Sequence, residues 1–425
     1  MSILAPDQYS CGSCGYCGNR YGDYSYRADG IDLTGEFYQE LLDRGWRRSG
    51  NLLYKPDQRA SCCPPYTIRV DSLEYRPSKE QRQALNRFNK QIIGQKYLTA
   101  AARLYPRTRE QAQKRKQEFD LVERIHECEL SVQKAPLVHD QAFLVTLETN
   151  KFTEEKFHLF ENYQRIVHKQ KADLINRESF KQFLCTSPIR ITHKNVNGTP
   201  QPIGSYHQCY WIDGNLVAIG VLDLLPHSVS GVYFMYHESV REFNFGKISA
   251  MREIALAKEK GYRWWYPGFY IHENIKMKYK RKFSPLQILS PETYQWCPLT
   301  KEILSQLNSS KYLSFTTEEN CAQTTLPSPQ NPQIKISTSQ SPMVEDIYIP
   351  LYERDMPGTL NKDQLMTEID LDSILVRIPD VIIQARKLLY WNETSLENYS
   401  SLKSIVAEIA CALGPELCKN VVLDL

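Results

Sequence analysis

Residues 204–225 read GSYHQCYWIDGNLVAIGVLDLL, and this stretch decides much of the fold. The segment from Gly204 to Ile212 alternates in polarity, whereas the segment from Leu216 to Leu225 is almost continuously apolar. The residues Asp213-Gly214-Asn215 lie between the two runs and are typical of a tight turn. Turn residues between two such runs predict a β-hairpin.

The elements that follow the hairpin extend this pattern. We expect a strand at 231–236 and an amphipathic helix at 246–260, since its apolar residues recur at helical spacing. Gly261 is suited to end that helix, and a strand at 262–266 follows it. Three strands, a helix and a strand are the order of a GNAT-type acyltransferase core. We therefore predict an α+β fold with a GNAT-like core, an N-terminal cysteine-rich metal or cluster module and a C-terminal helical extension.

The start of the central helix argues against an acyl-CoA donor. Enzymes of this type that use acyl-CoA place a glycine-rich loop there, whose amide groups bind the pyrophosphate. In this chain the helix begins Asn244-Phe245-Gly246-Lys247, with a single glycine. We expect neither acetyl-CoA nor a nucleotide cofactor.

A cysteine pattern near the N-terminus predicts a metal site. Cys14-Gly15-Tyr16-Cys17 is a Cys-x-x-Cys turn, and the adjacent pair Cys62-Cys63 lies some forty-five residues later. Four thiolates can bind zinc or an iron–sulfur cluster, and spacing does not distinguish the two. Cys11 is an alternative partner for Cys14. Both Cys62 and Cys63 can be ligands only if the backbone turns between them, and the following Pro64-Pro65 favours such a turn.

Composition limits the remaining possibilities. The chain has 425 residues and a net charge of +3, so nucleic-acid binding would depend on local basic clusters. The longest apolar stretch, 216–222, is too short to cross a membrane. The start of the chain has no secretory pattern. We expect reduced thiols and a cytoplasmic protein, with the nucleus as a second location.

Composition also changes along the chain. Residues 78–116 are basic and helical in pattern, which fits either a solvated helix face or phosphate binding. Residues 316–343 are rich in Ser, Thr, Pro and Gln. We expect a loop-rich cysteine module at 1–75, a basic helical connector at 76–134 and the GNAT-like domain at 135–315. A flexible loop at 316–343 is followed at 344–425 by a further strand-like segment and a C-terminal helical segment.

Several ordered blocks of this sequence resemble eukaryotic arginyl-tRNA–protein transferases. The resemblance covers about residues 9–80 and 185–300. It implies transfer of arginine from arginyl-tRNA to the α-amine of proteins that begin with Asp, Glu or oxidised Cys, which marks them for degradation. The implied partners are arginyl-tRNA, those acceptor proteins and a ubiquitin ligase of the N-degron pathway, with no membrane. The matching blocks are Cys14–Cys17, Asp43–Gly50, Cys62–Arg69, Gly204–Gln208, Val229–Phe234, Pro267–His272, Lys276–Lys280 and Pro291–Tyr294.

This reaction requires a carboxylate for the arginyl guanidinium, because a carboxylate can accept two hydrogen bonds from it. The candidates are Asp223, Glu238 and Glu253. Asp223 lies in an apolar strand, where an unpaired carboxylate is costly, and its alternative role is to cap the turn before Pro226. We expect Glu253 at the surface of the central helix.

The acidic first side chain of the acceptor requires a cation, and the same cations could bind tRNA phosphate or simply be solvated. The candidates for acceptor or tRNA binding are Arg47, Arg48, Lys276, Lys278, Tyr279 and Lys280. The candidates for orienting the amine and the ester are Tyr206, His207 and Gln208, of which His207 has a pKa suited to a base. Two alternative functions stay open: an acetyl-CoA-dependent N-acyltransferase, and a non-catalytic tRNA-binding protein with a GNAT-like core.

Overall fold

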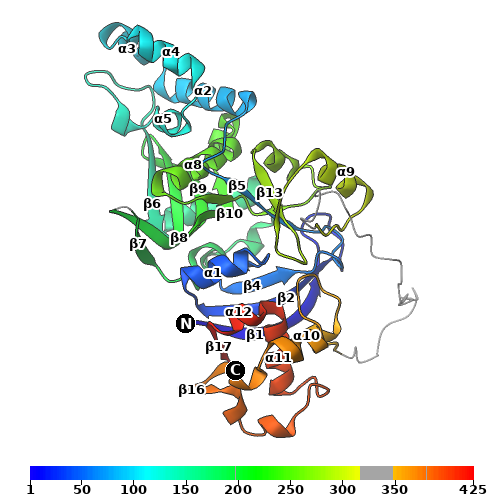
Figure 1. Ribbon diagram of the computed structural model, residues 1–425. Helices are drawn as coiled ribbons and strands as arrows, with labels where there is room; N and C mark the ends of the chain where they lie inside the picture. The colour runs from blue at the N-terminus through cyan, green and yellow to red at the C-terminus, as the bar shows by residue number, and fades with distance from the viewer. Residues whose placement is uncertain (197, 316–347, 380) are drawn as a thin grey trace.

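The computed structural model describes residues 1–196, 198–315, 348–379 and 381–425 (Figure 1). The loop predicted at 316–343 lies outside these residues. The helices are α1 Gly35–Leu42, α2 Lys79–Ile93, α3 Gln95–Leu104, α4 Arg109–Gln117, α5 Leu121–His126, α6 Glu154–Ile166, α7 Arg177–Phe180, α8 Phe245–Lys260, α9 Lys301–Ser309, α10 Lys362–Glu368, α11 Leu402–Leu413 and α12 Pro415–Cys418. The strands are β1 Ser2–Gly12, β2 Asp23–Asp32, β3 Arg47–Ser49, β4 Leu52–Pro56, β5 Tyr66–Asp71, β6 Phe143–Thr149, β7 Thr192–Val196, β8 Thr199–Ile212, β9 Asn215–Leu225, β10 Ser228–Tyr236, β11 Trp264–Tyr266, β12 Phe269–Tyr270, β13 Leu286–Leu289, β14 Trp296–Pro298, β15 Leu375–Ile378, β16 Val381–Gln384 and β17 Val421–Asp424.

The strands form two sheets of mixed α/β architecture. The first has the order β16-β15-β17-β1-β2-β4-β3, and the second has the order β14-β13-β5-β11-β10-β9-β8-β6. In Figure 1 the first sheet, blue with a red and orange margin, lies below the green second sheet. The basic helices α2–α4 lie at the end of the molecule farthest from the first sheet.

The predicted hairpin is confirmed as β8 and β9. Ile212 pairs with Asn215, and the two residues between them, Asp213 and Gly214, both have positive φ. Two such residues make the turn whose twist matches paired strands. β9 is almost continuously apolar because both of its faces are buried: Leu222 and Leu224 lie in the core beneath α8, and Ile219 and Val221 lie in a second core that includes α6.

The central helix α8 is also confirmed. It ends at Gly261, whose φ of 76° is the left-handed conformation that glycine adopts readily. The strand after it, β11, pairs in parallel with β10 only up to Ser230 and Tyr266. Beyond that point β10 continues, whereas the other strand ends and the chain turns through Pro267 and Gly268. The two strands therefore part at this position.

Three structural expectations require correction. The expected loop-rich module at 1–75 is rich in strands over residues 1–56. Its last strand, β5, belongs to the second sheet. The strand expected at 344–355 is absent over 348–355, where the structure has a short 3₁₀ helix, Leu351–Glu353. The C-terminal segment is not only helical, because β17 pairs in parallel with β1 and β15 pairs with β17. Local pattern could not reveal this pairing, since it joins the two ends of the chain.

Candidate functional site

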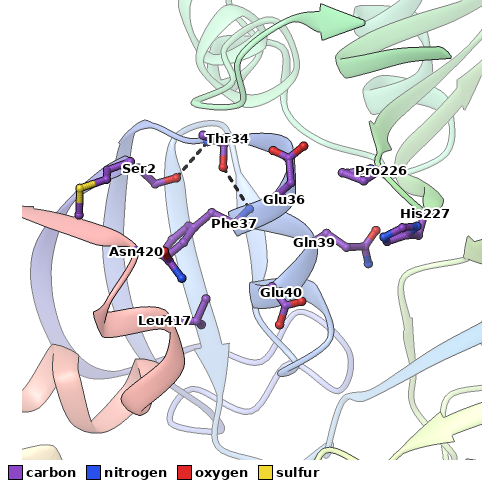
Figure 2. Close-up of a pocket in the computed structure, with 11 residues that line it drawn as sticks. Ser2, Thr34, Glu36, Phe37, Gln39, Glu40, Pro226, His227, Leu417 and Asn420 are labelled. Carbon is purple, nitrogen blue, oxygen red and sulfur yellow. Dashed lines mark hydrogen bonds between the residues drawn. The ribbon is translucent and has the colours of Figure 1, made fainter. Parts of the chain in front are cut away.

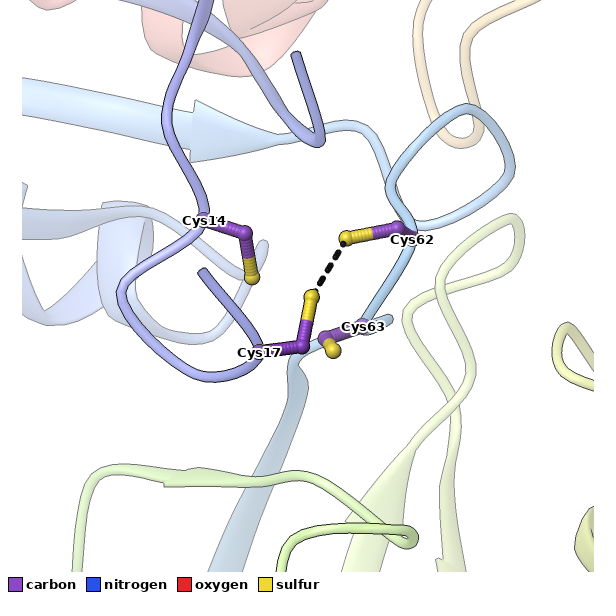
Figure 3. Close-up of side chains that lie close together, drawn as sticks. All are labelled: Cys14, Cys17, Cys62 and Cys63. Atoms are coloured by element: carbon purple, nitrogen blue, oxygen red, sulfur yellow. Dashed lines mark hydrogen bonds between the residues drawn. The ribbon is translucent and has the colours of Figure 1, made fainter. Parts of the chain in front are cut away.

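The N-terminal cysteines form a compact cluster. Four sulfur atoms lie within 4.8 Å of one another: those of Cys14, Cys17, Cys62 and Cys63. The sulfurs of Cys17 and Cys62 are 3.3 Å apart. Figure 3 shows the first pair on the turn after β1 and the second pair on the loop after β4. The backbone bends at residues 62–63, as expected. The candidate Cys11 does not belong to this group.

This donor set fits a metal centre. A tetrahedral ion bound at about 2.3 Å by four sulfurs holds them about 3.8 Å apart, which agrees with the observed spacing. Close packing supports the geometry, because a methyl group at Gly22 would overlap the sulfur of Cys62. The four cysteines could therefore hold a metal without rearrangement of the backbone.

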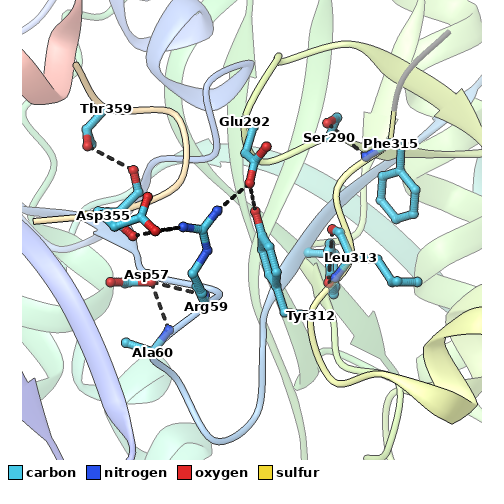
Figure 4. A network of polar contacts seen from close by, with 12 residues as sticks. Asp57, Arg59, Ala60, Ser290, Glu292, Tyr312, Leu313, Phe315, Asp355 and Thr359 are labelled. Carbon is cyan, nitrogen blue, oxygen red and sulfur yellow. Dashed lines mark hydrogen bonds and ion pairs between the residues drawn. The ribbon is translucent and has the colours of Figure 1, made fainter. Parts of the chain in front are cut away.

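Arg59 links the cysteine loop to two other parts of the chain. Its guanidinium contacts Glu292 at 2.5 Å and also Asp355, while Tyr312 donates a hydrogen bond of 2.7 Å to Glu292 (Figure 4). These side chains are partly exposed, so each ion pair contributes at most about 1 kcal/mol. The network connects the loop after β4 both to the region after β13 and to the C-terminal segment.

Asp223 forms a buried ion pair with Arg48. The Nε and Nη2 atoms of Arg48 both donate to the carboxylate of Asp223 at 2.7 Å, and the hydroxyl of Ser205 donates to the same carboxylate at 2.6 Å. The two charged side chains are 1% and 0% exposed. This carboxylate, one of the three candidates for the arginyl group, is thus already occupied by a guanidinium of the chain itself.

Arg47 precedes Arg48 on β3, so its side chain points to the other face of the sheet. Its guanidinium lies 5.0 Å from the ring centre of Phe269 and 5.9 Å from that of Tyr266. Nη1 donates to the carbonyl of Trp46 at 2.9 Å. Nε and Nη2 have no acceptor among the described residues, although the residue is only 7% exposed.

Glu253 is buried, which corrects our expectation of a surface residue. Trp265 donates a hydrogen bond of 2.7 Å from its indole nitrogen to the Glu253 carboxylate. Burial raises the pKa of Glu253 to about 7, because water no longer solvates the charged form. Helix periodicity could not identify this side chain as buried, since α8 is covered on most of its surface.

Lys280 lies beside Glu253 and Arg47. Its Nζ donates to the carbonyl of Phe269 at 2.7 Å. The pKa of Lys280 is lowered to about 7 in total: burial has the largest effect, the Arg47 charge also lowers the pKa, and the Glu253 charge opposes both. The structure therefore brings together Arg47, Lys280 and Glu253, which lie far apart in the sequence.

These three residues meet where β10 and β11 part. A methyl group at Gly231 would lie 3.0 Å from the Glu253 carboxylate, and one at Gly268 would lie 3.6 Å from Nζ of Lys280. Sequence reasoning did not select Gly231 or Trp265 as members of the site. An isolated glycine within a strand was an available signal, because it often marks a close approach of backbone to another group.

The structure places His207 on the opposite face of β8 from Tyr206 and Gln208. Neighbouring strand residues point to opposite faces, and Tyr206 belongs to the core beneath α8. His207 donates from Nε2 to the carbonyl of Leu184 at 3.0 Å, and burial lowers its pKa to about 4. Gln208 accepts a hydrogen bond of 2.7 Å from Tyr210.

The remaining candidates lie nearer the surface. Glu238, Lys276 and Tyr279 are exposed, and Lys278 is half-buried. Glu238 accepts a hydrogen bond of 3.1 Å from Asn162. These positions suit contacts with a large ligand rather than an enclosed site.

A cavity of about 420 Å³ lies elsewhere, between α1, the turn after β9 and the C-terminal helices (Figure 2). Glu36, Glu40 and His227 are its charged or titratable lining groups, and Thr34 caps the adjacent helix by accepting from the amide of Phe37. The residues that line it include no candidate selected from the sequence. In the part of the chain that the structure describes, no helix has the length and apolar character needed to cross a membrane.

Comparisons with known proteins match two regions of the chain. The family model described as the N terminus of arginine-tRNA-protein transferase matches residues 12–83, and the model described as its C terminus matches residues 155–290. Arginyl-tRNA–protein transferase 1 of Drosophila melanogaster is 27% identical over 73% of this chain and 84% of its own. Arginyl-tRNA–protein transferase 1 of Saccharomyces cerevisiae is 28% identical over 75% of this chain and 67% of its own. Among solved structures, L-PGS from Bacillus licheniformis aligns with a TM-score of 0.29 and 11% identity, covering 52% of this chain and 56% of that one.

Proposed function

The chain belongs to the arginyl-tRNA–protein transferase family, and we propose that it transfers arginine from arginyl-tRNA to the α-amine of proteins beginning with Asp, Glu or oxidised Cys. The supporting observation is that the two matched regions supply the residues that meet at the buried site. Arg47 comes from the first region, and Glu253 and Lys280 come from the second. The product would be an N-degron read by a ubiquitin ligase, in the cytoplasm and the nucleus.

The element order supports a GNAT-like core for this enzyme. The sequence β8, β9, β10, α8, β11, with parallel strands that part after a short pairing, is the arrangement that such a core requires. The parting strands leave β10 without a β11 partner beyond Ser230, beside the buried carboxyl group of Glu253. We assign the transfer reaction to this position.

The reaction is aminolysis of an ester. The acceptor amine attacks the arginyl carbonyl carbon, a C–N bond forms, and the ester C–O bond to the terminal tRNA ribose breaks. The ribose oxygen leaves as a hydroxyl group, and the α-ammonium group releases one proton overall. Since the ester is already activated, orientation and removal of this proton supply the catalysis.

Glu253 is suited to accept the proton. A base works best when its pKa is near the working pH, and the pKa of Glu253 is about 7. The hydrogen bond from Trp265 orients its carboxylate. Lys280, on the same site, is a cation that can be placed near the developing negative charge on the carbonyl oxygen.

The basic helices supply a surface for tRNA. Several lysine and arginine side chains on α2, α3 and α4 are exposed, and phosphate contacts of this kind dominate the affinity for nucleic acid. The acceptor stem would lie against these helices through its backbone. The exposed cations of these helices include Lys79, Arg82, Arg87, Lys90, Lys96, Arg103, Arg109 and Lys114.

The cysteine cluster would hold zinc or an iron–sulfur cluster through Cys14, Cys17, Cys62 and Cys63. Such a centre would stabilise the two loops that carry its ligands. The observed sulfur spacing supports one tetrahedral ion, and four thiolates also support an iron–sulfur cluster. Anaerobic analysis of zinc, iron and acid-labile sulfide in the purified protein distinguishes them.

A transfer assay tests the proposed function. The protein is incubated with radiolabelled arginyl-tRNA and peptides that begin with Asp, Glu, Ala or Lys; leucyl-tRNA and acetyl-CoA replace the donor in control reactions. Arginine transfer restricted to the acidic peptides is the expected result. Acetyl transfer would support an acetyl-CoA-dependent enzyme instead. Retained tRNA binding without transfer to any peptide would identify a non-catalytic tRNA-binding protein.

A further inference from the structure

Two neighbouring arginines on β3 present the same group of atoms in opposite directions. Arg48 uses Nε and Nη2 together to hold the carboxylate of Asp223, with both distances 2.7 Å. This planar pair of donors matches the two oxygens of a carboxylate. In this protein, therefore, the Nε and Nη2 donors of an arginine bind a carboxylate.

The equivalent face of Arg47 has no such partner. Its Nε and Nη2 meet no acceptor among the residues that the structure describes, and it forms no ion pair with any carboxylate in that part of the chain. The side chain is nevertheless 93% buried, since 7% of its surface is exposed. An arginine stays protonated, and a buried charge without a counter-ion is costly. The site is therefore built to receive an anion.

The surroundings of Arg47 increase its need for an anionic partner. The Lys280 charge lies close enough to interact with it. The nearby carboxylate of Asp43 is already engaged, because it accepts a hydrogen bond of 2.5 Å from Tyr266 and lies 4.0 Å from Arg69. Arg47 and Lys280, whose pKa is lowered to about 7, thus lie near one another, with the Glu253 carboxyl beside Lys280 and the Asp43 carboxylate held by other groups.

One end of this site reaches the surface. Tyr54 lies directly opposite Arg47 on β4, so their side chains share a face. Tyr54 is partly exposed and packs against Phe269 with ring centres 6.3 Å apart. Arg27, also partly exposed, pairs with Tyr54 from the next strand and lies on the same face. The partly exposed ring of Tyr54 and the ring of Phe269 therefore lie between solvent-facing residues and the buried guanidinium.

We propose that the Nε and Nη2 atoms of Arg47 bind the side-chain carboxylate of the acceptor's first residue, and that Arg47 thereby sets the preference for acidic N-termini. The inference rests on the proposed function. A tRNA phosphate is the other anion available, but it belongs to a bulky backbone that cannot easily reach a group with 7% exposure. A short acidic side chain can reach it, and its two oxygens match the two free donors.

The location agrees with the chemistry. Arg47 contacts Phe269, whose carbonyl accepts the hydrogen bond from Lys280, and Lys280 in turn interacts with Glu253. A first residue whose carboxylate is held by Arg47 would therefore place its own α-amine near the base. Arg47 would then bind the side chain of the acceptor's first residue, and Glu253 would remove the proton from the α-amine of that same residue.

The test compares two peptides that differ only in Asp or Asn at the first position. We expect the variants Arg47→Lys and Arg47→Gln to reduce the Asp-to-Asn ratio of kcat/KM about 10- to 150-fold, the range for a lost hydrogen bond to a charged group. The lysine variant keeps the charge but not the paired donors. The KM for arginyl-tRNA should stay at the wild-type value. Arg386→Gln, an exposed arginine in the C-terminal segment, is the control and should keep the wild-type ratio.

The outcomes separate the two levels of inference. If the wild-type protein transfers arginine to neither peptide, the proposed function itself fails. If the wild type prefers Asp and both Arg47 variants keep that preference, the assignment of Arg47 is overturned. A rise in the KM for arginyl-tRNA with an unchanged Asp-to-Asn ratio would also overturn it, because Arg47 would then contact the tRNA. A melting temperature near wild type, with transfer to the Asn peptide retained, would show that a variant is folded.

Discussion

The buried pair of Arg48 and Asp223 leads to a sharp prediction about stability. The change Asp223→Asn keeps the shape of the side chain but removes its negative charge, so Arg48 becomes a buried cation without a counter-ion. Both side chains are at most 1% exposed, and two hydrogen bonds of 2.7 Å join them. Removing one partner of such a pair costs about 3–5 kcal/mol. If the domain that contains the pair unfolds as a unit of about 150–250 residues, its melting temperature should fall by about 6–20 °C.

Thermal unfolding followed by circular dichroism measures this effect, together with the KM for arginyl-tRNA. The matched control is Glu238→Gln, since Glu238 is an exposed carboxylate selected from the sequence for the same role. We expect its melting temperature to change little. The double variant Arg48→Met with Asp223→Leu should recover much of the lost stability, because it removes both charges.

A different result would refute this reasoning. If Asp223→Asn keeps the wild-type melting temperature and raises the KM for arginyl-tRNA, then Asp223 binds the arginyl group and Arg48 does not depend on it. The ion pair would then be a contact that opens when the donor binds.

Three further predictions concern catalysis, pH and the metal centre. The pKa of Glu253 is raised to about 7, and Glu253 acts as a base only when deprotonated, so the rate should rise with pH through 7. Glu253→Gln should lower kcat roughly 10²–10⁴-fold. In a pH–rate profile of this variant, the rise should move to the pKa of the acceptor amine, about 8. Hydrogen bonds to two glutamates raise the pKa of His126 from 6.5 to about 9, so its stabilisation is complete below pH 6.5 and is lost as the pH rises through 9; the difference in melting temperature between wild type and His126→Gln should therefore be larger at pH 6 than at pH 9.5, and an equal difference would contradict this. Gly22→Ala should lower metal content measured by mass spectrometry, because its methyl group overlaps Cys62, whereas Gly15→Ala, with nothing within 4 Å, should keep it.

Several features could be predicted because they depend on neighbouring residues in the chain. A turn with Asp213 and Gly214 between two apolar runs forms a hairpin wherever those runs can pair. Gly261 ends α8 because it alone tolerates the left-handed conformation there without strain. The Cys-x-x-Cys turn similarly brings two thiols together through local backbone geometry.

The candidate site was predicted only in part. The sequence indicated Arg47 and Arg48 as cations in a matching block and Asp223 and Glu253 as candidate carboxylates, but it could not assign partners among them. Arg48 and Asp223 are 175 residues apart, and their pairing depends on how β3 packs against the second sheet. The same packing leaves the donors of Arg47 without an acceptor among the described residues.

The sequence by itself determined the hairpin, the strands next to the central helix, that helix and the cysteine motif, because periodicity, turn residues and capping act over a few residues. Only the tertiary structure decided which charged groups are buried and which lie together. It joined β17 to β1, placed Glu253 inside the protein and paired Arg48 with Asp223 of the second sheet. The physical reason is that burial and charge pairing depend on surfaces contributed by distant segments, and no local pattern contains both surfaces.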